Sequence, residues 1–180
     1  RFRNVTGVQT CALPISYEPG STFKMVTVAA ALEEHLTTPD EMIDCQNGAI
    51  VIYGRRIKDH NPYGLLSVRQ IIQNSSNVGT IKLALRVGEN RLASYIARMG
   101  FGAPTAVDLP AEVGGRVRDL DQWSKTSIGS VAIGQEISVT PLQIVSMAAA
   151  VANGGILYRP YVVQRVADPL TGVIESKPEG

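Results

Sequence analysis

The stretch Tyr17-Glu18-Pro19-Gly20-Ser21-Thr22-Phe23-Lys24 leads directly into the apolar segment Met25–Leu32. Pro19 and Gly20 favour a bend, and a short hydroxyl side chain suits a helix start, so we expect a helix that begins at or near Ser21. This helix is apolar on nearly every face, which is typical of a buried helix. Ser21 and Lys24 are three residues apart and therefore share one helix face.

A serine and a lysine on one face of a buried helix can act as nucleophile and base. A serine hydroxyl is a poor nucleophile until a neighbour takes its proton. Burial and the positive end of a helix both disfavour a charged lysine, so its amine can act as that base. The structural alternative is that Ser21 only caps the helix and that Lys24 extends to water.

The composition indicates one globular domain with a real core. The chain has 180 residues, of which 44% are hydrophobic and 18% charged, and its net charge of +1 gives no argument for a nucleic-acid partner. No apolar run is long enough to span a membrane, and no signal peptide opens the sequence. Cys11 and Cys45 do not amount to a disulfide framework, and no cluster of metal ligands is visible, so we expect no metal and no cofactor.

The first fifteen residues are interpreted as foreign to the protein. The segment Val5–Ile15 back-translates into a sequence that resembles a common short-read library adapter fused in frame. We therefore expect the native sequence to start near Ser16, in the middle of a domain, and residues 1–15 are excluded from fold reasoning. Without Arg1 and Arg3, 15 basic residues face 16 acidic ones, a net charge of −1, and Cys45 is left alone.

Periodicity and turn signals predict the remaining elements. The predicted strands are 49–53, its return 56–59 after a turn at 54–55, 156–166, and another that starts at 173 after a turn at 168–172. The predicted helices are 68–73 after a Ser67 cap, 78–87, 90–99, and one capped by Thr140, with Pro141 first and Gln143 three residues after the cap. Residues 101–125 are expected to be loop-rich. The pair Asp59-His60 suggests a Ser-His-Asp triad, but a lysine base makes His60 redundant.

A second polar motif, Ser75-Ser76-Asn77, lies 54 residues after Ser21, between two predicted helices. A loop there can bring its side chains beside the first helix. Ser75 could then pass a proton between Lys24, Ser21 and a leaving amine, and Asn77 could hold a substrate amide. The structural alternative is a polar turn between helices.

Together the two motifs resemble the signature of penicillin-binding proteins and serine β-lactamases. The sequence from Ser16 to Gly180 is similar to the transpeptidase domain of class B penicillin-binding proteins. The segments that carry this resemblance, in order and at family-like spacing, are Glu18–Lys24, Gly54–Asp59, Ser75–Gly79, Gly100–Gly102, Leu109–Glu112, Gly134 and Ser138–Gln143. The resemblance implies an α/β (α+β) fold, an antiparallel sheet with a helical subdomain, of which residues 16–180 form an incomplete part.

The resemblance also implies roles for individual residues. Ser21 is the nucleophile, Lys24 its base, and Ser75 the proton relay to the leaving group, while Asn77 orients the substrate peptide and Lys24. The implied reaction is attack on the D-Ala-D-Ala bond of a peptidoglycan stem peptide, loss of D-Ala and cross-linking to a neighbouring stem, in cell division or elongation. The implied partners are stem peptides, β-lactams that acylate Ser21, and a membrane glycosyltransferase. The implied location is the outer side of the bacterial inner membrane, held by a single anchor outside these residues.

The third motif of the family, Lys-Ser/Thr-Gly on a strand, is absent from these 180 residues. Lys125-Thr126-Ser127 is no substitute, because it precedes the Thr140 helix and has serine where glycine must allow close approach to a ligand. We therefore expect the 180 residues alone to have little transpeptidase activity and to fold poorly. Two alternatives stay open: a serine β-lactamase with Glu112 as its second base, and a β-lactam-sensing receptor domain.

Overall fold

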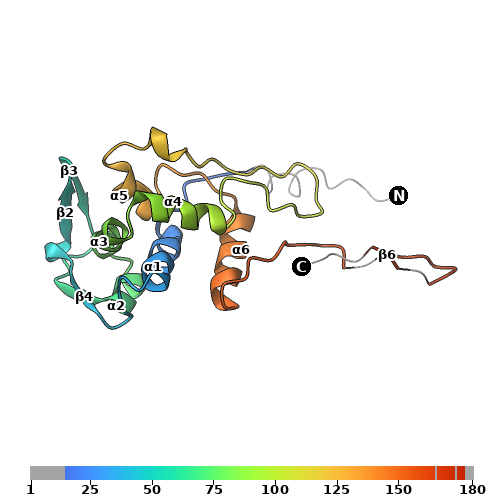
Figure 1. Cartoon of the computed structure of the whole chain (residues 1–180), viewed down its shortest axis with the longest axis horizontal. Helices are drawn as coiled ribbons and strands as arrows, with labels where there is room; N and C mark the ends of the chain where they lie inside the picture. The colour runs from blue at the N-terminus through green and yellow to red at the C-terminus, as the bar shows by residue number, and fades with distance from the viewer. Residues whose placement is uncertain (1–14, 165, 173, 177–180) are drawn as a thin grey trace.

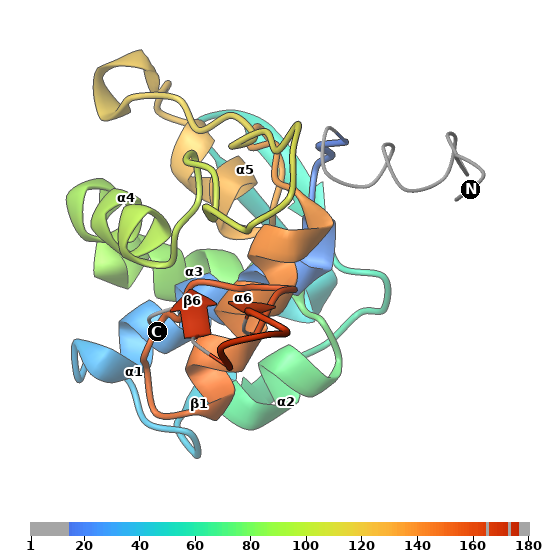
Figure 2. The same cartoon turned by 90° about the vertical axis from the view of Figure 1, so that its right-hand side faces the viewer.

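The computed structural model describes residues 15–164, 166–172 and 174–176, so the segment 1–15 that was interpreted as foreign lies outside the described residues except for Ile15. Helices form the main body, and the segment after the last helix leads away from it (Figures 1 and 2). The elements, with 3₁₀ turns written η, are η1 (Gly20–Phe23), α1 (Lys24–Glu33), β1 (Met42–Asp44), η2 (Gln46–Gly48), β2 (Ala49–Ile52), β3 (Arg55–Lys58), β4 (Leu65–Ser67), α2 (Val68–Gln73), α3 (Asn77–Val87), α4 (Glu89–Arg98), η3 (Leu120–Gln122), α5 (Ser127–Ala132), α6 (Pro141–Ala152), β5 (Val166–Ala167) and β6 (Ile174–Ser176).

The core is built around α1, as its apolar sequence predicts. Helices α2, α3, α4 and α5 all contact α1, so it has neighbours on several sides. Phe23, Val26, Ala30 and Ala31 are fully buried. The small alanines let neighbouring helices approach closely, which makes α1 a rigid support for the residues at its start.

The expected helix start is shifted by a few residues. A 3₁₀ turn begins at Gly20, and the α-helix proper begins at Lys24. Ser21 lies inside this turn and its side chain caps nothing, because the cap position is Pro19. The interpretation of Ser21 as a helix cap is therefore wrong.

The strands form three antiparallel pairs, β1 with β4, β2 with β3, and β5 with β6. The predicted hairpin is confirmed, with Ala49 opposite Lys58 and Ile52 opposite Arg55. Its turn lies at Tyr53-Gly54, one residue earlier than expected, and both residues have positive φ, 45° and 83°. The β1–β4 pair was not expected, since three-residue strands carry too short a pattern to recognise.

The helix caps follow the sequence closely. Ser67 and Thr140 both form capping boxes, with Gln70 and Gln143 respectively, and Pro141 occupies the first turn of α6. Helix α3 ends before Gly88, whose φ of 81° suits glycine. Helices α2, α3, α4 and α6 are therefore confirmed within a residue or so of their expected bounds.

One expectation about secondary structure is wrong, and one helix was not predicted. The described residues 156–164 are irregular rather than a strand, and Val166 begins β5. Side-chain bonds hold this segment instead: Asp108 accepts the N–H groups of Val162 and Val163 (2.7 Å each), and Arg159 donates to the carbonyl of Ala106 (2.6 Å). Helix α5 was missed because it is short and consists mainly of small residues, including Gly129, which leaves room for the side chain of Ile52.

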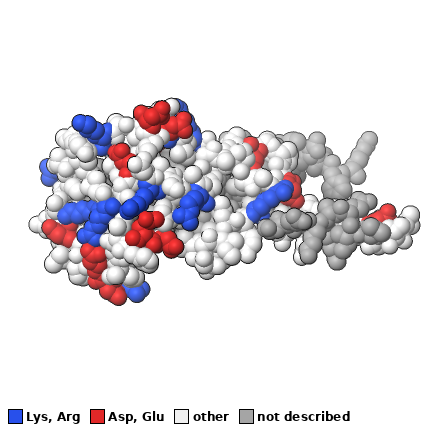
Figure 3. Space-filling model, in the orientation of Figure 1, with Lys and Arg blue, Asp and Glu red and all other residues white. Residues whose placement is uncertain are grey.

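Charges of both signs are interspersed on the face drawn in Figure 3. Within the described ranges, no helix has the length and apolar character needed to cross a membrane.

Candidate active site

The candidate nucleophile sits on the short turn η1 that precedes α1. Pro19 and Gly20 bend the chain, Gly20 with φ of 56°, and the Thr22 hydroxyl closes the turn by donating to the Pro19 carbonyl (2.8 Å). Ser21 is exposed, and its hydroxyl has no hydrogen-bond partner among the residues that the structure describes. A free hydroxyl on a fixed turn is suited to attack a bound substrate.

A second segment, residues 134–139, holds this turn from the side. Tyr17 and Val139 exchange two backbone hydrogen bonds (2.9 Å each), and the Gly20 N–H donates to the Gly134 carbonyl (3.0 Å). Gly134 has a φ of 77°, and a Cβ there would lie 2.2 Å from the Gly20 oxygen. Only glycine fits this contact, which the sequence pattern did not reveal.

Lys24, the candidate base, is buried and faces the second motif. Its side chain is 2% exposed, and its Nζ donates to both the Oγ (2.9 Å) and the carbonyl oxygen (2.5 Å) of Ser75. Burial lowers the pKa of Lys24 from 10.5 to about 8, against the charge of Asp59, which raises it. The interpretation of Lys24 as a lysine that extends to water is therefore wrong.

Ser75 reaches Lys24 from a strained backbone. It lies between α2 and α3 with a φ of 54°, a left-handed conformation that costs free energy for any residue but glycine. Its N–H donates to the Ile72 carbonyl (3.1 Å), while its own carbonyl and hydroxyl both meet the Lys24 amine. The turn between α2 and α3 therefore contacts the start of α1 through Ser75 and Lys24.

Asn77, the fourth member of the predicted site, begins α3 and faces the hairpin. Its side-chain Nδ2 donates to the backbone carbonyl of Lys58 at the end of β3 (2.7 Å). Among the described contacts none joins Asn77 to Lys24, so the structure brings Lys24 and Ser75 together and leaves Asn77 beside them. Its role toward the substrate stays a prediction.

Asp59 is a site residue that the sequence pattern did not find. Its carboxylate accepts hydrogen bonds from the Asn77 N–H (2.5 Å), the Val78 N–H (3.0 Å) and the Ser76 hydroxyl (2.8 Å). Apart from its place in the Gly54–Asp59 segment of the resemblance, Asp59 was considered in the sequence analysis as a partner for His60, which is exposed in the turn that follows. An aspartate 18 residues before the helix start that it caps leaves no local signal in the sequence.

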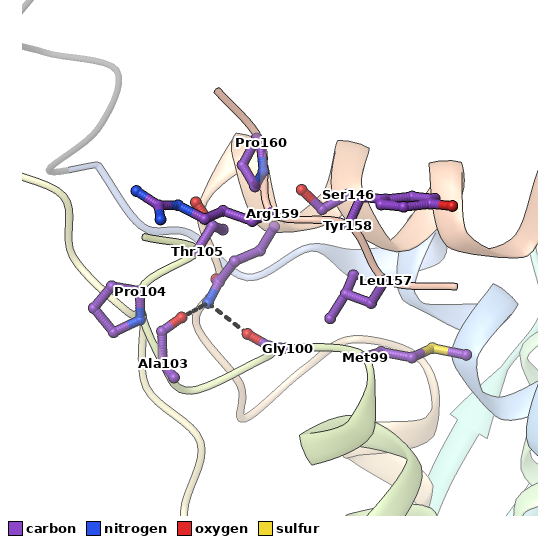
Figure 4. A pocket seen from close by; sticks show the side chains of 11 residues that line it. Met99, Gly100, Ala103, Pro104, Thr105, Ser146, Leu157, Tyr158, Arg159 and Pro160 are labelled. Carbon is purple, nitrogen blue, oxygen red and sulfur yellow. Dashed lines mark hydrogen bonds between the residues drawn. The ribbon is translucent and has the colours of Figure 1, made fainter. Parts of the chain in front are cut away.

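A cavity of about 240 Å³ lies apart from these residues (Figure 4). It is lined by the 99–105 loop, by α6 and by residues 157–160, and none of Ser21, Lys24 and Ser75 contributes to it. The dashed bonds that end on the carbonyls of Gly100 and Ala103 come from the Gln143 amide, at 3.2 and 2.8 Å. These bonds tie α6 to the loop, so the cavity belongs to the packing of the fold. In the part of the chain that is described, no group of His, Cys, Asp and Glu residues is placed to hold a metal ion.

Comparison with known proteins gives consistent matches. Residues 6–180 match the model of the penicillin binding protein transpeptidase domain. Stage V sporulation protein D of Bacillus subtilis is 39% identical over 165 residues, which cover 88% of this chain and 25% of that protein. Peptidoglycan D,D-transpeptidase FtsI of Escherichia coli K12 is 33% identical over 156 residues, covering 87% of this chain and 26% of that protein. The chain therefore spans about a quarter of the length of these relatives.

Solved structures agree with the sequence matches. Penicillin-binding protein 3 of Mycobacterium tuberculosis, crystallised in complex with aztreonam, superposes with a TM-score of 0.87 at 34% identity, over 93% of this chain and 37% of that one. The same protein in complex with ampicillin gives the same values. This likeness confirms the predicted fold class, helices combined with antiparallel strands in an incomplete form of a larger domain.

Proposed function

Because the chain belongs to the penicillin-binding protein transpeptidase family, we propose that it carries the nucleophile, base and proton relay of a peptidoglycan D,D-transpeptidase. The observation that carries this proposal is the buried Lys24 amine bonded to Ser75, one helical turn after the free hydroxyl of Ser21. The complete protein acts in cell-wall cross-linking, beside a membrane glycosyltransferase and on the outer side of the inner membrane.

The first half of the proposed reaction is acylation of Ser21. Neutral Lys24 takes the proton of the Ser21 hydroxyl as its oxygen attacks the carbonyl of the D-Ala-D-Ala bond. The proton passes through the Ser75 hydroxyl to the departing amine, so that D-Ala leaves and an ester forms on Ser21. With a pKa of about 8, about one Lys24 amine in ten is neutral at pH 7, far more than for an ordinary lysine.

The second half reverses the proton path. The amine of a neighbouring stem peptide attacks the ester, gives a proton to Lys24 through Ser75, and forms the cross-link while Ser21 recovers its hydroxyl. Asn77 holds the backbone amide of the substrate peptide with its own donor and acceptor. A β-lactam follows the first half only: its ring amide opens on Ser21 and the acyl group stays attached.

The β-lactamase alternative depends on Glu112 as a second base. Its carboxylate instead accepts three hydrogen bonds within its own loop, from the Thr105 N–H (2.7 Å), the Thr105 hydroxyl (2.5 Å) and the Ala106 N–H (2.9 Å). This arrangement favours a structural role for Glu112 and therefore the transpeptidase. A receptor domain that senses β-lactams would use the same serine and would differ in the protein segments next to this domain. None of the contacts described above favours it.

The experiment that tests the proposal is covalent labelling with a fluorescent penicillin, followed by peptide mapping. We expect one label on Ser21 in the gene product that contains this sequence, none in Ser21→Ala, and full labelling in Ser94→Ala, a matched change at an exposed serine on α4. Label that persists in Ser21→Ala would refute the proposal. We expect the 180 residues alone to cross-link at a rate lower by about 10² or more, since they contain no Lys-Ser/Thr-Gly segment to complete the oxyanion site.

A further inference from the structure

Asp59 joins the β2–β3 hairpin to the start of α3. It follows β3 directly, yet its carboxylate oxygens bond to groups 17 to 19 residues further along the chain. One oxygen accepts two successive backbone N–H groups, those of Asn77 and Val78, and the other accepts the hydroxyl of Ser76. A carboxylate that accepts N–H groups at a helix start makes strong, charge-assisted hydrogen bonds.

Ser76 completes this arrangement. It is fully buried and is the N-cap of α3, where its hydroxyl accepts the N–H of Gly79 (2.9 Å) while donating to Asp59. Asp59 and Ser76 together therefore satisfy the first three backbone donors of α3, which have no partner within the helix. Ser75 and Asn77 lie on either side of Ser76, so the clamp made by Asp59 and Ser76 fixes both residues of the second motif that the proposed reaction uses.

Asp59 is also the negative charge that acts on Lys24. Helix α5 carries no ionisable side chain, and Ser21 and Ser75 are the neutral groups at the site. The basic residues of the other helices that pack against α1 are engaged elsewhere: Lys82 with the Asp44 carbonyl, Arg86 with Glu41, Arg91 with Glu34, Arg98 with the Tyr95 ring, and Arg69 with Asp40. The acidic residue of these helices, Glu89, is exposed in the first turn of α4.

We infer that Asp59 is a positioning residue of the active site: its hydrogen bonds to Ser76, Asn77 and Val78 hold the second motif in place, with Ser75 against Lys24, and it adds a negative charge to this site. This inference rests on the proposed function, because it concerns the same Ser21 acylation. It has two separable consequences. Loss of the hydrogen bonds misplaces Ser75, which lowers the rate at every pH. Loss of the charge makes the Lys24 amine easier to deprotonate, which moves the rate profile to lower pH.

Two variants separate these consequences. Asp59→Asn keeps the shape and an acceptor oxygen for the two N–H groups but removes the charge, whereas Asp59→Ala removes both. Asp40→Asn is the matched control, an exposed aspartate that pairs with the exposed Arg69 at 2.9 Å. Each is made in the gene product that contains this sequence, and acylation by a fluorescent penicillin is measured from pH 6 to 10 beside the thermal unfolding temperature.

We expect acylation by the unmodified protein to rise with pH around a midpoint near 8, where Lys24 loses its proton. In Asp59→Asn the midpoint falls by about one pH unit, the lower end of the effect of one close opposite charge, and the plateau rate falls less than tenfold. In Asp59→Ala the plateau falls further, by about 10- to 100-fold, as expected when a catalytic group is displaced. Asp40→Asn leaves midpoint and plateau unchanged.

An unchanged or raised midpoint in Asp59→Asn would overturn the inference, as would a plateau in Asp59→Ala equal to that of the unmodified protein. A direct titration of the Lys24 amine by NMR of labelled lysine makes the same comparison without any acylation. If Ser21 takes no label at any pH, the proposed function fails, while the NMR titration still decides whether Asp59 controls Lys24.

Discussion

The Nζ of Lys24 lies 2.9 Å from the hydroxyl oxygen of Ser75 and 2.5 Å from its carbonyl oxygen, and these two residues are 51 positions apart in the chain. Lys24 comes from the start of the central helix and Ser75 from a strained loop. Because the lysine side chain is 2% exposed, water does not solvate the amine when it is charged. The hydrogen bonds to Ser75 and the charge of Asp59 replace only part of the lost hydration, so a protonated Lys24 lowers the stability of the folded state.

Replacement of Lys24 by methionine should separate activity from stability. Methionine fills a similar volume without a charge, so we expect acylation by penicillin to fall by at least about 10², the usual contribution of a general base. We expect the unfolding temperature to stay the same or rise, because a buried charge is removed. Fluorescent-penicillin time courses and thermal unfolding check both, with exposed Lys125→Met as the control. Acylation at the original rate in Lys24→Met would remove this residue from the mechanism.

The stability of the protein should depend on pH through Lys24. Its pKa is about 8 in the folded state and 10.5 when unfolded. Between these values the unfolded state binds more protons, so the free energy of unfolding contributed by Lys24 increases as pH rises from about 8 to 10.5. The gain amounts to about 3 kcal/mol at 1.36 kcal/mol per pH unit.

The measurement is urea unfolding of the unmodified protein and of Lys24→Met at several pH values between 7 and 10.5. The difference between the two isolates Lys24 from other groups. Tyr95 is one of these, since burial and the bond to Glu34 raise its pKa, which lowers stability at high pH in both proteins alike. A difference that stays constant across this range would contradict the prediction.

Gly134 should be required for the geometry of the nucleophile turn. A Cβ at this position would lie 2.2 Å from the Gly20 oxygen, so Gly134→Ala must displace the peptide that precedes Ser21. We expect a loss of at least about 2 kcal/mol of stability, from the clash and the positive φ together, and slower acylation. Gly154→Ala is the matched control, because Gly154 also has positive φ but no atom within 4 Å of an added Cβ. Equal effects of the two changes would show that the contact with Gly20 is unimportant.

Local signals account for the part of the fold that the sequence predicted. The capping boxes at Ser67 and Thr140, the Gly88 stop and the alternating hairpin all depend on neighbours within a few residues, and all are present. The strand predicted at 156–166 is absent from the described residues 156–164. Their apolar sequence resembles a strand, but a strand also needs a partner strand, and here the N–H groups of Val162 and Val163 donate to the Asp108 carboxylate instead.

The residues of the candidate site likewise differ in whether local sequence could indicate them. Ser21, Lys24 and Ser75 could be proposed as site residues from the sequence because their residue types and spacing suit a nucleophile, a base and a proton relay, and the resemblance implied their roles. The contacts of Asp59 and Gly134 could not be predicted because each residue meets a segment far away in the chain, Asp59 the start of α3 and Gly134 the Gly20 backbone. Such contacts are decided by tertiary packing, which no local pattern encodes.

The contacts of Glu112 allow a test between the transpeptidase and the β-lactamase. Glu112→Ala leaves the N–H groups of Thr105 and Ala106 without their acceptor, so we expect stability to fall by about 1–3 kcal/mol. The lifetime of the penicillin ester on Ser21 should not change, because a carboxylate bonded within its own loop activates no water there. Exposed Glu89→Ala on α4 is the control. A penicillin ester that survives more than about tenfold longer in Glu112→Ala would instead identify Glu112 as a deacylating base, and the β-lactamase would then be the better description of this site.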